Sequence, residues 1–124
     1  INIKDAFIIN IGINFEIRVS TGFNNQEILL NCISKVQNTF NIDKWQINQP
    51  ISKSEIQKVL LGVIGVQSVP NITFTNISGE SSGYSKYKYD LDSATQNDII
   101  YPSLDPCIFE VKYPNTDIKG QIVT

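Results

Sequence analysis

Hydrophobic and polar residues alternate along the first organised segment of the chain, residues 7–20. Ile, Phe and Val occupy the odd positions from Ile9 to Val19, and polar residues or glycine, beginning with Asn10, occupy the even ones. Alternation with a period of two predicts a long β-strand with one apolar and one polar face. We expect the polar face of this strand to meet water or a partner.

Two later segments carry apolar residues at the spacing of an amphipathic helix. The first is predicted to start at a cap formed by Asn24 or Asn25 and to run to about residue 40. The second starts at an S-x-x-E capping box, in which Ser52 precedes Glu55 by three positions, and must end near Gly62. Both helices therefore have local start signals in the sequence.

Further strands are predicted on both sides of the second helix. Residues 44–48 alternate weakly before Pro50 and suggest a brief edge strand, and residues 66–77 form a longer one in which Pro70 predicts a bulge or an edge position. The last third has an alternating segment at 108–113, a possible final strand at 118–123 and no long helix.

This order of elements predicts an α+β fold, because it runs strand, helix, short strand, helix, strand before the character of the chain changes. Two helices should pack on one face of a small mixed β-sheet. We assign residues 1–78 to this core. Residues 79–124 are expected to form an extended, hairpin-rich segment, containing tyrosine and proline, that packs on the core or on a partner.

Composition removes most catalytic chemistry and several partners. Histidine is absent, which excludes Ser-His-Asp and Cys-His nucleophile systems, and the chain is predicted not to be an enzyme. Ten Lys plus Arg against twelve Asp plus Glu leave no basic face for nucleic acid. No run of about 18 apolar residues exists to span a membrane. We expect no catalytic residues, cofactor, metal or small-molecule substrate.

Two smaller signals have local structural interpretations. Asp90, Asp92 and Asp98 could hold a cation, but their spacing lacks the glycine and closing glutamate of an EF-hand. A turn in which Asp and Ser side chains bond to nearby backbone is the favoured interpretation. Cys32 and Cys107 are expected to be free thiols because their spacing fits neither a disulfide framework nor a metal site.

All five tyrosines follow residue 83, in a part of the chain that also contains three of the five prolines. Tyrosine offers a large rigid ring with a polar tip and is enriched at protein interfaces, although the same rings could merely cover the sheet. A segment of about 40 residues without a helix is costly to order alone, which favours an interface. The candidate interface residues are Tyr84, Tyr87, Tyr89, Tyr101 and Tyr113.

Several short motifs resemble a known family. They are WQINQP at 45–50 and GVIGVQSV at 62–69, each following a predicted helix, and then YDLD at 89–92, IYPSLDP at 100–106 and FEVKYP at 109–114. Together they resemble the C-terminal α+β domain of baseplate wedge proteins of contractile-tailed phages, of the baseplate-J type found in T4-like and marine cyanophages. The resemblance extends over about residues 8–124.

The resemblance implies a non-enzymatic virion protein of the tail baseplate, assembled in the cytoplasm of the bacterial host. Such a subunit is expected to form a homodimer and to contact other wedge proteins. The absence of methionine and the start at Ile1 lead us to expect a fragment of a longer product. The alternative is a binding module whose exposed aromatic residues, including Trp45, hold a small ligand or a glycan.

Overall fold

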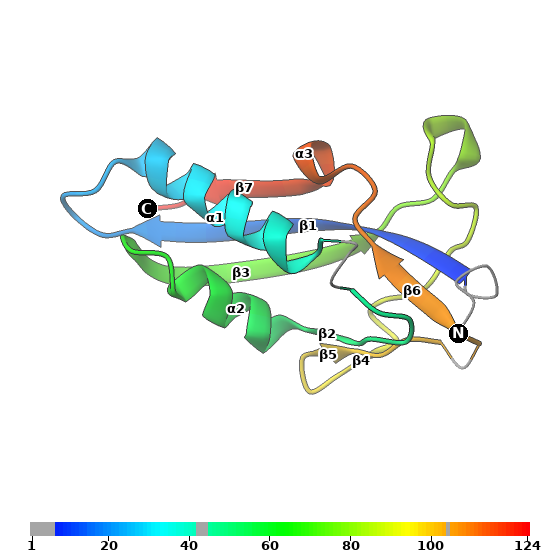
Figure 1. The fold of residues 1–124 in the computed structure, drawn as a ribbon. Coiled ribbons are helices and arrows are strands. Elements are labelled where there is room, and N and C mark those ends of the chain that lie inside the picture. The colour runs from blue at the N-terminus through cyan, green and yellow to red at the C-terminus, as the bar shows by residue number, and fades with distance from the viewer. Residues whose placement is uncertain (1–6, 42–44, 104) are drawn as a thin grey trace.

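The structure is a computed structural model that describes residues 7–41, 45–103 and 105–124, and its fold is α+β. Figure 1 shows two longer helices lying side by side on a twisted sheet. The elements are β1 (Phe7–Val19), α1 (Asn25–Thr39), β2 (Ile51–Ser52), α2 (Lys53–Leu61), β3 (Val66–Asn76), η2 (Glu80–Ser82), β4 (Thr95–Gln96), β5 (Ile99–Ile100), β6 (Cys107–Glu110), α3 (Pro114–Asp117) and β7 (Ile118–Ile122). Among these helices, none is long and apolar enough to cross a membrane.

The main sheet is mixed and is organised around β1. β3 pairs with β1 in antiparallel orientation on one side. On the other side β6 pairs with the first residues of β1, and β7 pairs with its later residues, both in parallel orientation. The short α3 lies between these two strands in sequence, so one edge of β1 is covered by two strands in succession. β2, β5 and β4 form a separate small sheet.

Both helices cover the same face of the main sheet (Figure 1). α1 contacts β7 and β1, α2 contacts β3, and the helices contact each other. The apolar residues of β1 from Ile9 to Ile17 are buried beneath them together with Cys32 and Val36 of α1. Burial of each such side chain stabilises the fold by about 1.5–3 kcal/mol, so this layer supplies most of the driving force for folding.

The two helix starts confirm the predicted caps. The Asn24 side chain accepts a hydrogen bond from the backbone N–H of Glu27 at 3.0 Å, and the Ser52 hydroxyl accepts one from the N–H of Glu55 at 3.3 Å. The Glu55 carboxylate lies 3.6 Å from the Lys58 ammonium. α2 ends at Leu61, immediately before Gly62, as its sequence predicts.

The predicted strand at residues 44–48 is wrong for the part that the structure describes, since Lys44 lies outside the described residues. The chain forms a turn here, and Asn48 has a φ of 62°, which interrupts an extended conformation. Asn48 donates its N–H to the Cys107 carbonyl at 2.7 Å and accepts the Cys107 N–H on its side chain at 3.1 Å. These contacts to a distant strand outweigh the weak local alternation. The short strand here is β2, which follows Pro50.

The C-terminal segment is integrated into the main sheet more fully than the sequence pattern predicts. β7 confirms the expected final strand and β6 confirms the first part of the strand expected at 108–113, which ends at Glu110; both pair with β1 and neither forms a hairpin. The hairpin expected in this segment is β4–β5, whose turn residues Asn97 and Asp98 both have positive φ. Asn and Asp tolerate this left-handed conformation better than most residues, which explains the tight turn.

Asn10 is an exception to the prediction that the polar face of the first strand meets water or a partner, because other segments of the same chain cover it. Its side chain is 1% exposed and donates to the Glu110 carboxylate at 2.7 Å. The amide oxygen of the same Asn10 side chain accepts a hydrogen bond from the backbone N–H of Ser85 at 2.6 Å. The Asn10 carbonyl accepts from the Asn76 side chain, which in turn accepts the Tyr89 N–H, both at 2.9 Å. The segment after β3 is therefore fastened over this end of β1.

We predict that Asn10→Ala lowers the free energy of unfolding by about 2–4 kcal/mol, because it leaves the Ser85 N–H and the Glu110 carboxylate without their buried partner. Chemical denaturation measures the change. The matched control is Asn14→Ala, an exposed asparagine on the same strand, which should change the free energy by under about 0.5 kcal/mol. Equal effects of the two substitutions would contradict the role assigned to Asn10.

Candidate functional site

The face of the main sheet opposite the helices is polar and open over its central part. In one row across the sheet, Asn14 of β1 pairs with Thr73 of β3 and Lys119 of β7. In the next row, Glu16 pairs with Asn71 and Gln121 of the same two strands. These two rows follow from the alternation in β1, because every second residue of a strand points to the same face.

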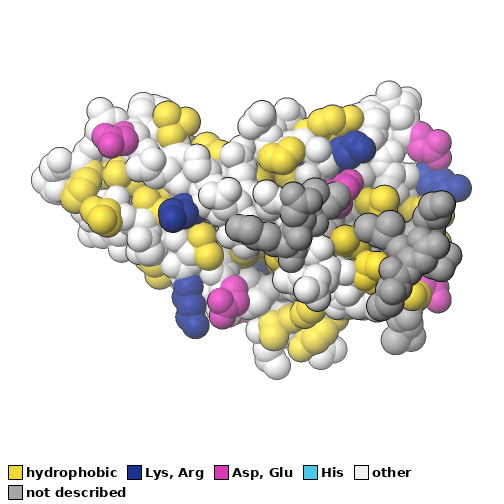
Figure 2. Space-filling view, in the orientation of Figure 1, with side chains coloured by type: hydrophobic (Ala, Val, Ile, Leu, Met, Phe, Trp, Pro, Cys, Tyr) yellow, Lys and Arg dark blue, Asp and Glu magenta, His cyan; other side chains and the backbone are white. Residues whose placement is uncertain are grey.

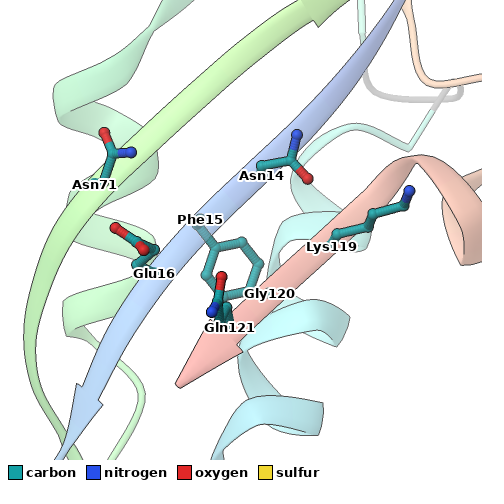
Figure 3. Close-up of a pocket in the computed structure, with 7 residues that line it drawn as sticks. All are labelled: Asn14, Phe15, Glu16, Asn71, Lys119, Gly120 and Gln121. Carbon is teal, nitrogen blue, oxygen red and sulfur yellow. The ribbon is translucent and has the colours of Figure 1, made fainter. Parts of the chain in front are cut away.

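Figure 3 looks onto this face and shows the side chains of Asn14, Glu16 and Gln121 projecting from neighbouring strands, with Asn71 and Lys119 at its margins. They line a shallow depression of about 470 Å³. Phe15 and Gly120 form the backbone floor, and the Phe15 ring is buried toward the helices. A β-carbon at Gly120 would lie 2.5 Å from that ring, so glycine is required where β7 and Phe15 approach each other.

The chemistry of this polar face is hydrogen bonding and charge pairing. It presents a carboxylate from Glu16, an ammonium from Lys119 and amides that can both donate and accept. Among the described residues, the one ion pair joins Lys58 and Glu55 on α2. Glu16 and Lys119 therefore have no charged partner within the described part of the chain. This face is suited to contact with a polar surface.

The candidate tyrosines do not form one surface, because the structure places them in three groups. Tyr84 and Tyr113 form the first group, with their rings edge to face at 5.3 Å. The Tyr84 hydroxyl donates to both carboxylate oxygens of Asp117, at 2.9 and 3.0 Å. Asp117 is 7% exposed, so this contact supplies a hydrogen-bond donor to a carboxylate that has little access to water. Tyr84 anchors the loop to α3.

Tyr89 and Tyr101 form the second group, through a hydrogen bond from the Tyr89 hydroxyl to the Tyr101 carbonyl at 2.7 Å. The Tyr89 ring also lies 6.0 Å from that of Phe109 in β6. Burial is the main cause that raises the pKa of Tyr89 above its ordinary value. Tyr89 therefore packs as part of the fold, whereas the Tyr101 side chain is 43% exposed.

Tyr87 forms the third group with Phe7, the first residue of β1. Their rings meet edge to face at 4.7 Å between centroids, and the Lys86 ammonium lies 5.5 Å from the Tyr87 ring. Both rings remain substantially exposed, Phe7 at 37% and Tyr87 at 38%. Phe7 was not a candidate from the sequence; its position at the start of the alternating strand gave no sign that it stays outside the core.

The remaining candidate groups have local roles. Asp90 accepts the backbone N–H of Ser93 at 3.2 Å and the Ser93 hydroxyl at 2.7 Å, which confirms the predicted turn. These hydrogen bonds lower the pKa of Asp90. Cys32 and Cys107 are free and buried, as expected, and burial raises the pKa of Cys32 to about 11. A thiol with that pKa is a poor nucleophile at neutral pH.

The contact between Tyr84 and Asp117 predicts a dependence of stability on alkaline pH. The hydrogen bond to Asp117 is the main cause that raises the pKa of Tyr84 above its ordinary 10.0. The folded protein then holds this proton more tightly than the unfolded chain, so the stabilisation is complete below pH 10 and is lost as the pH rises through the raised pKa. Denaturation curves across this range should fall more steeply for the wild type than for Tyr84→Phe. Parallel curves would contradict the assignment.

No protein-family model matches this chain, and a search of the curated proteins finds no match either.

Proposed function

We propose that this chain is a non-enzymatic structural domain of a phage tail baseplate wedge subunit, which associates with a second copy of itself and with neighbouring baseplate proteins. The observation that carries the proposal is the exposed aromatic pair Phe7–Tyr87. Two rings that are each more than a third exposed lose little conformational entropy on binding, because each already rests on the other. The localisation proposed for the domain is the virion.

The anchored tyrosines support the same proposal. Tyr84 and Tyr89 use their hydroxyls inside the molecule and so hold the segment between them in place. Tyr87 lies between these two anchors in the sequence. The backbone of Tyr101 is held by the hydrogen bond from the Tyr89 hydroxyl to its carbonyl. Exposed tyrosines on a chain that is already ordered are typical of interface residues. Figure 2 shows hydrophobic side chains at the end of the molecule where β1 begins.

The alternative of a glycan-binding module receives no support from Trp45. Its ring stacks on Phe40 with 4.7 Å between ring centroids and is partly buried against the core. Its indole nitrogen is buried as well. A sugar platform needs one exposed face of the ring, and Trp45 packs that ring against its neighbours. The assembly function is therefore the one that we propose.

We predict that the domain forms a dimer whose population rises with protein concentration and survives high salt, because apolar contacts are not screened. Light scattering on the peak eluting from a size-exclusion column, at several concentrations and two salt levels, measures it. Tyr87→Lys and Tyr101→Lys should each weaken association by about tenfold or more, which corresponds to about 1.4 kcal/mol.

The matched control is Leu30→Lys, which places the same charge on α1 at an apolar residue that is 62% exposed. It should leave the dimer unchanged. Circular dichroism spectra identical to that of the wild type would show that each variant is folded. A monomer at every concentration, or equal weakening by all three substitutions, would contradict the proposed surface.

A further inference from the structure

β3 is an edge strand with one side open to a partner. Among the described strands it pairs with β1 alone, along most of its eleven residues. A strand edge presents a row of main-chain N–H and C=O groups, and unpaired groups of this kind are the template on which another extended chain can pair.

The register of β3 with β1 determines which main-chain N–H and C=O groups of β3 point away from β1. Ile77, just after β3, donates its N–H to the Asn10 carbonyl at 2.9 Å. The register from there to Asn71 is regular, and in an antiparallel pair the residues alternate between bonding the neighbour and pointing away from it. Thr73 and Thr75 therefore bond to β1, whereas Ile72 and Phe74 direct their main-chain groups outward.

Pro70 lies where the regular register ends. Glu16 of β1 pairs with Asn71 and Arg18 pairs with Ser68, so residues 69 and 70 of β3 lie opposite a single residue of β1 and the pairing is bulged there. A residue without an N–H is tolerated at a bulge or on an edge strand, and Pro70 occupies both. The structure thus confirms the bulge and the edge position that Pro70 predicts, and the regular part of the edge begins at Asn71.

Two depressions follow one another along this edge. One, of about 320 Å³, is lined by residues 69–72 of β3, by the start of α2 and by Asp98 of the β4–β5 turn. The other, of about 220 Å³, is lined by residues 74–76 and by residues 89–92. Each depression therefore lies between β3 and a neighbouring segment that is not paired with it. We refer to the two depressions together as the groove, and the seven residues of β3 that line them match the length of one short strand.

The walls of this groove are predominantly acidic. Asp90 and Asp92 line one depression, Asp98 lines the other, and Lys53 is the basic residue that lines them. All three aspartates are exposed. The hydrogen bonds from Ser93 that lower the pKa of Asp90 keep that carboxylate charged into the acidic range. The charge of the groove therefore complements a basic segment.

We propose that the outer edge of β3 binds an extended segment of a partner protein that carries lysine or arginine at alternate positions and adds to the main sheet beside β3. The main-chain groups of Ile72 and Phe74 provide the pairing, and the aspartates select the charge of the segment. Neither Phe7 nor Tyr87 lines this site, and the proposal does not depend on the proposed baseplate function. The polar face around Glu16 and Lys119 has mixed charge, so it does not favour one class of partner in the same way.

A first measurement tests whether the edge is open. Amide hydrogen exchange followed by NMR should show that the N–H groups of Ile72 and Phe74 exchange at least about tenfold faster than those of Thr73 and Thr75, which bond to β1. Slow exchange at all four residues would mean that the edge is already closed and would overturn the proposal.

The second measurement uses a blocked hexapeptide of alternating lysine and valine as the probe. Titration should shift the amide signals of β3 from Asn71 to Asn76 in a saturable way and should slow exchange at Ile72 and Phe74. The same peptide with alternate backbone nitrogens methylated cannot pair along a strand, and a peptide with glutamate in place of lysine has the wrong charge. Each should bind at least about tenfold more weakly.

A charge reversal in the groove completes the test. Asp92→Lys should weaken binding of the lysine peptide several-fold at low salt, whereas Glu80→Lys, an exposed acid on η2 outside both depressions, should leave it unchanged. Absence of saturable binding, signal shifts on another surface, or binding that survives backbone methylation would each overturn the proposal. Survival of binding in the methylated peptide would show attraction by charge alone.

Discussion

The position of β1 in the middle of the main sheet is the constraint on which the rest of the structure depends. This one strand pairs with β3 on one side and with both β6 and β7 on the other, and its apolar face carries the two helices. Its even-numbered residues then have two different environments. Asn10 is enclosed by the chain that returns after β3, whereas Asn14 and Glu16 remain on the open face. The buried amide fixes the course of residues 77–89, and with it the positions of Tyr84, Tyr87 and Tyr89.

Features that act within a few residues were predictable from the sequence. The caps at Asn24 and Ser52 and the end of α2 before Gly62 each depend on one turn of chain, so the local pattern contains the whole cause. Pro70 excluded a regular central position in a sheet because it has no N–H. The α+β class followed because periods of two and of 3.6 residues alternate along the chain. The polar face was likewise predictable, since one alternating strand places its polar residues together.

Features that depend on distant pairing were not predictable in the same way. Alternation around Asn10 is identical whether water or another segment covers the residue, and only its contacts with Glu110 and Ser85 distinguish the two cases. The turn at Asn48 is held by Cys107, 59 positions away. The division of the tyrosines between anchors and exposed rings also depends on partners such as Asp117 and Phe7, whose proximity no spacing in the sequence reveals.

The pairing of β1 with β6 has a consequence for how the chain reaches its native state. Asn10 and Glu110 are 100 positions apart, and β7 lies later still. A ribosome exposes β1 long before either parallel partner exists, so during synthesis its second edge stays unpaired, whereas β3 can pair with its first edge and the two helices can cover its apolar face. Contacts with such sequence separation form slowly, because the closing loop is long. The nascent chain therefore carries an isoleucine-rich strand with one unpaired edge until nearly all of the domain has emerged, and unpaired strand edges promote aggregation.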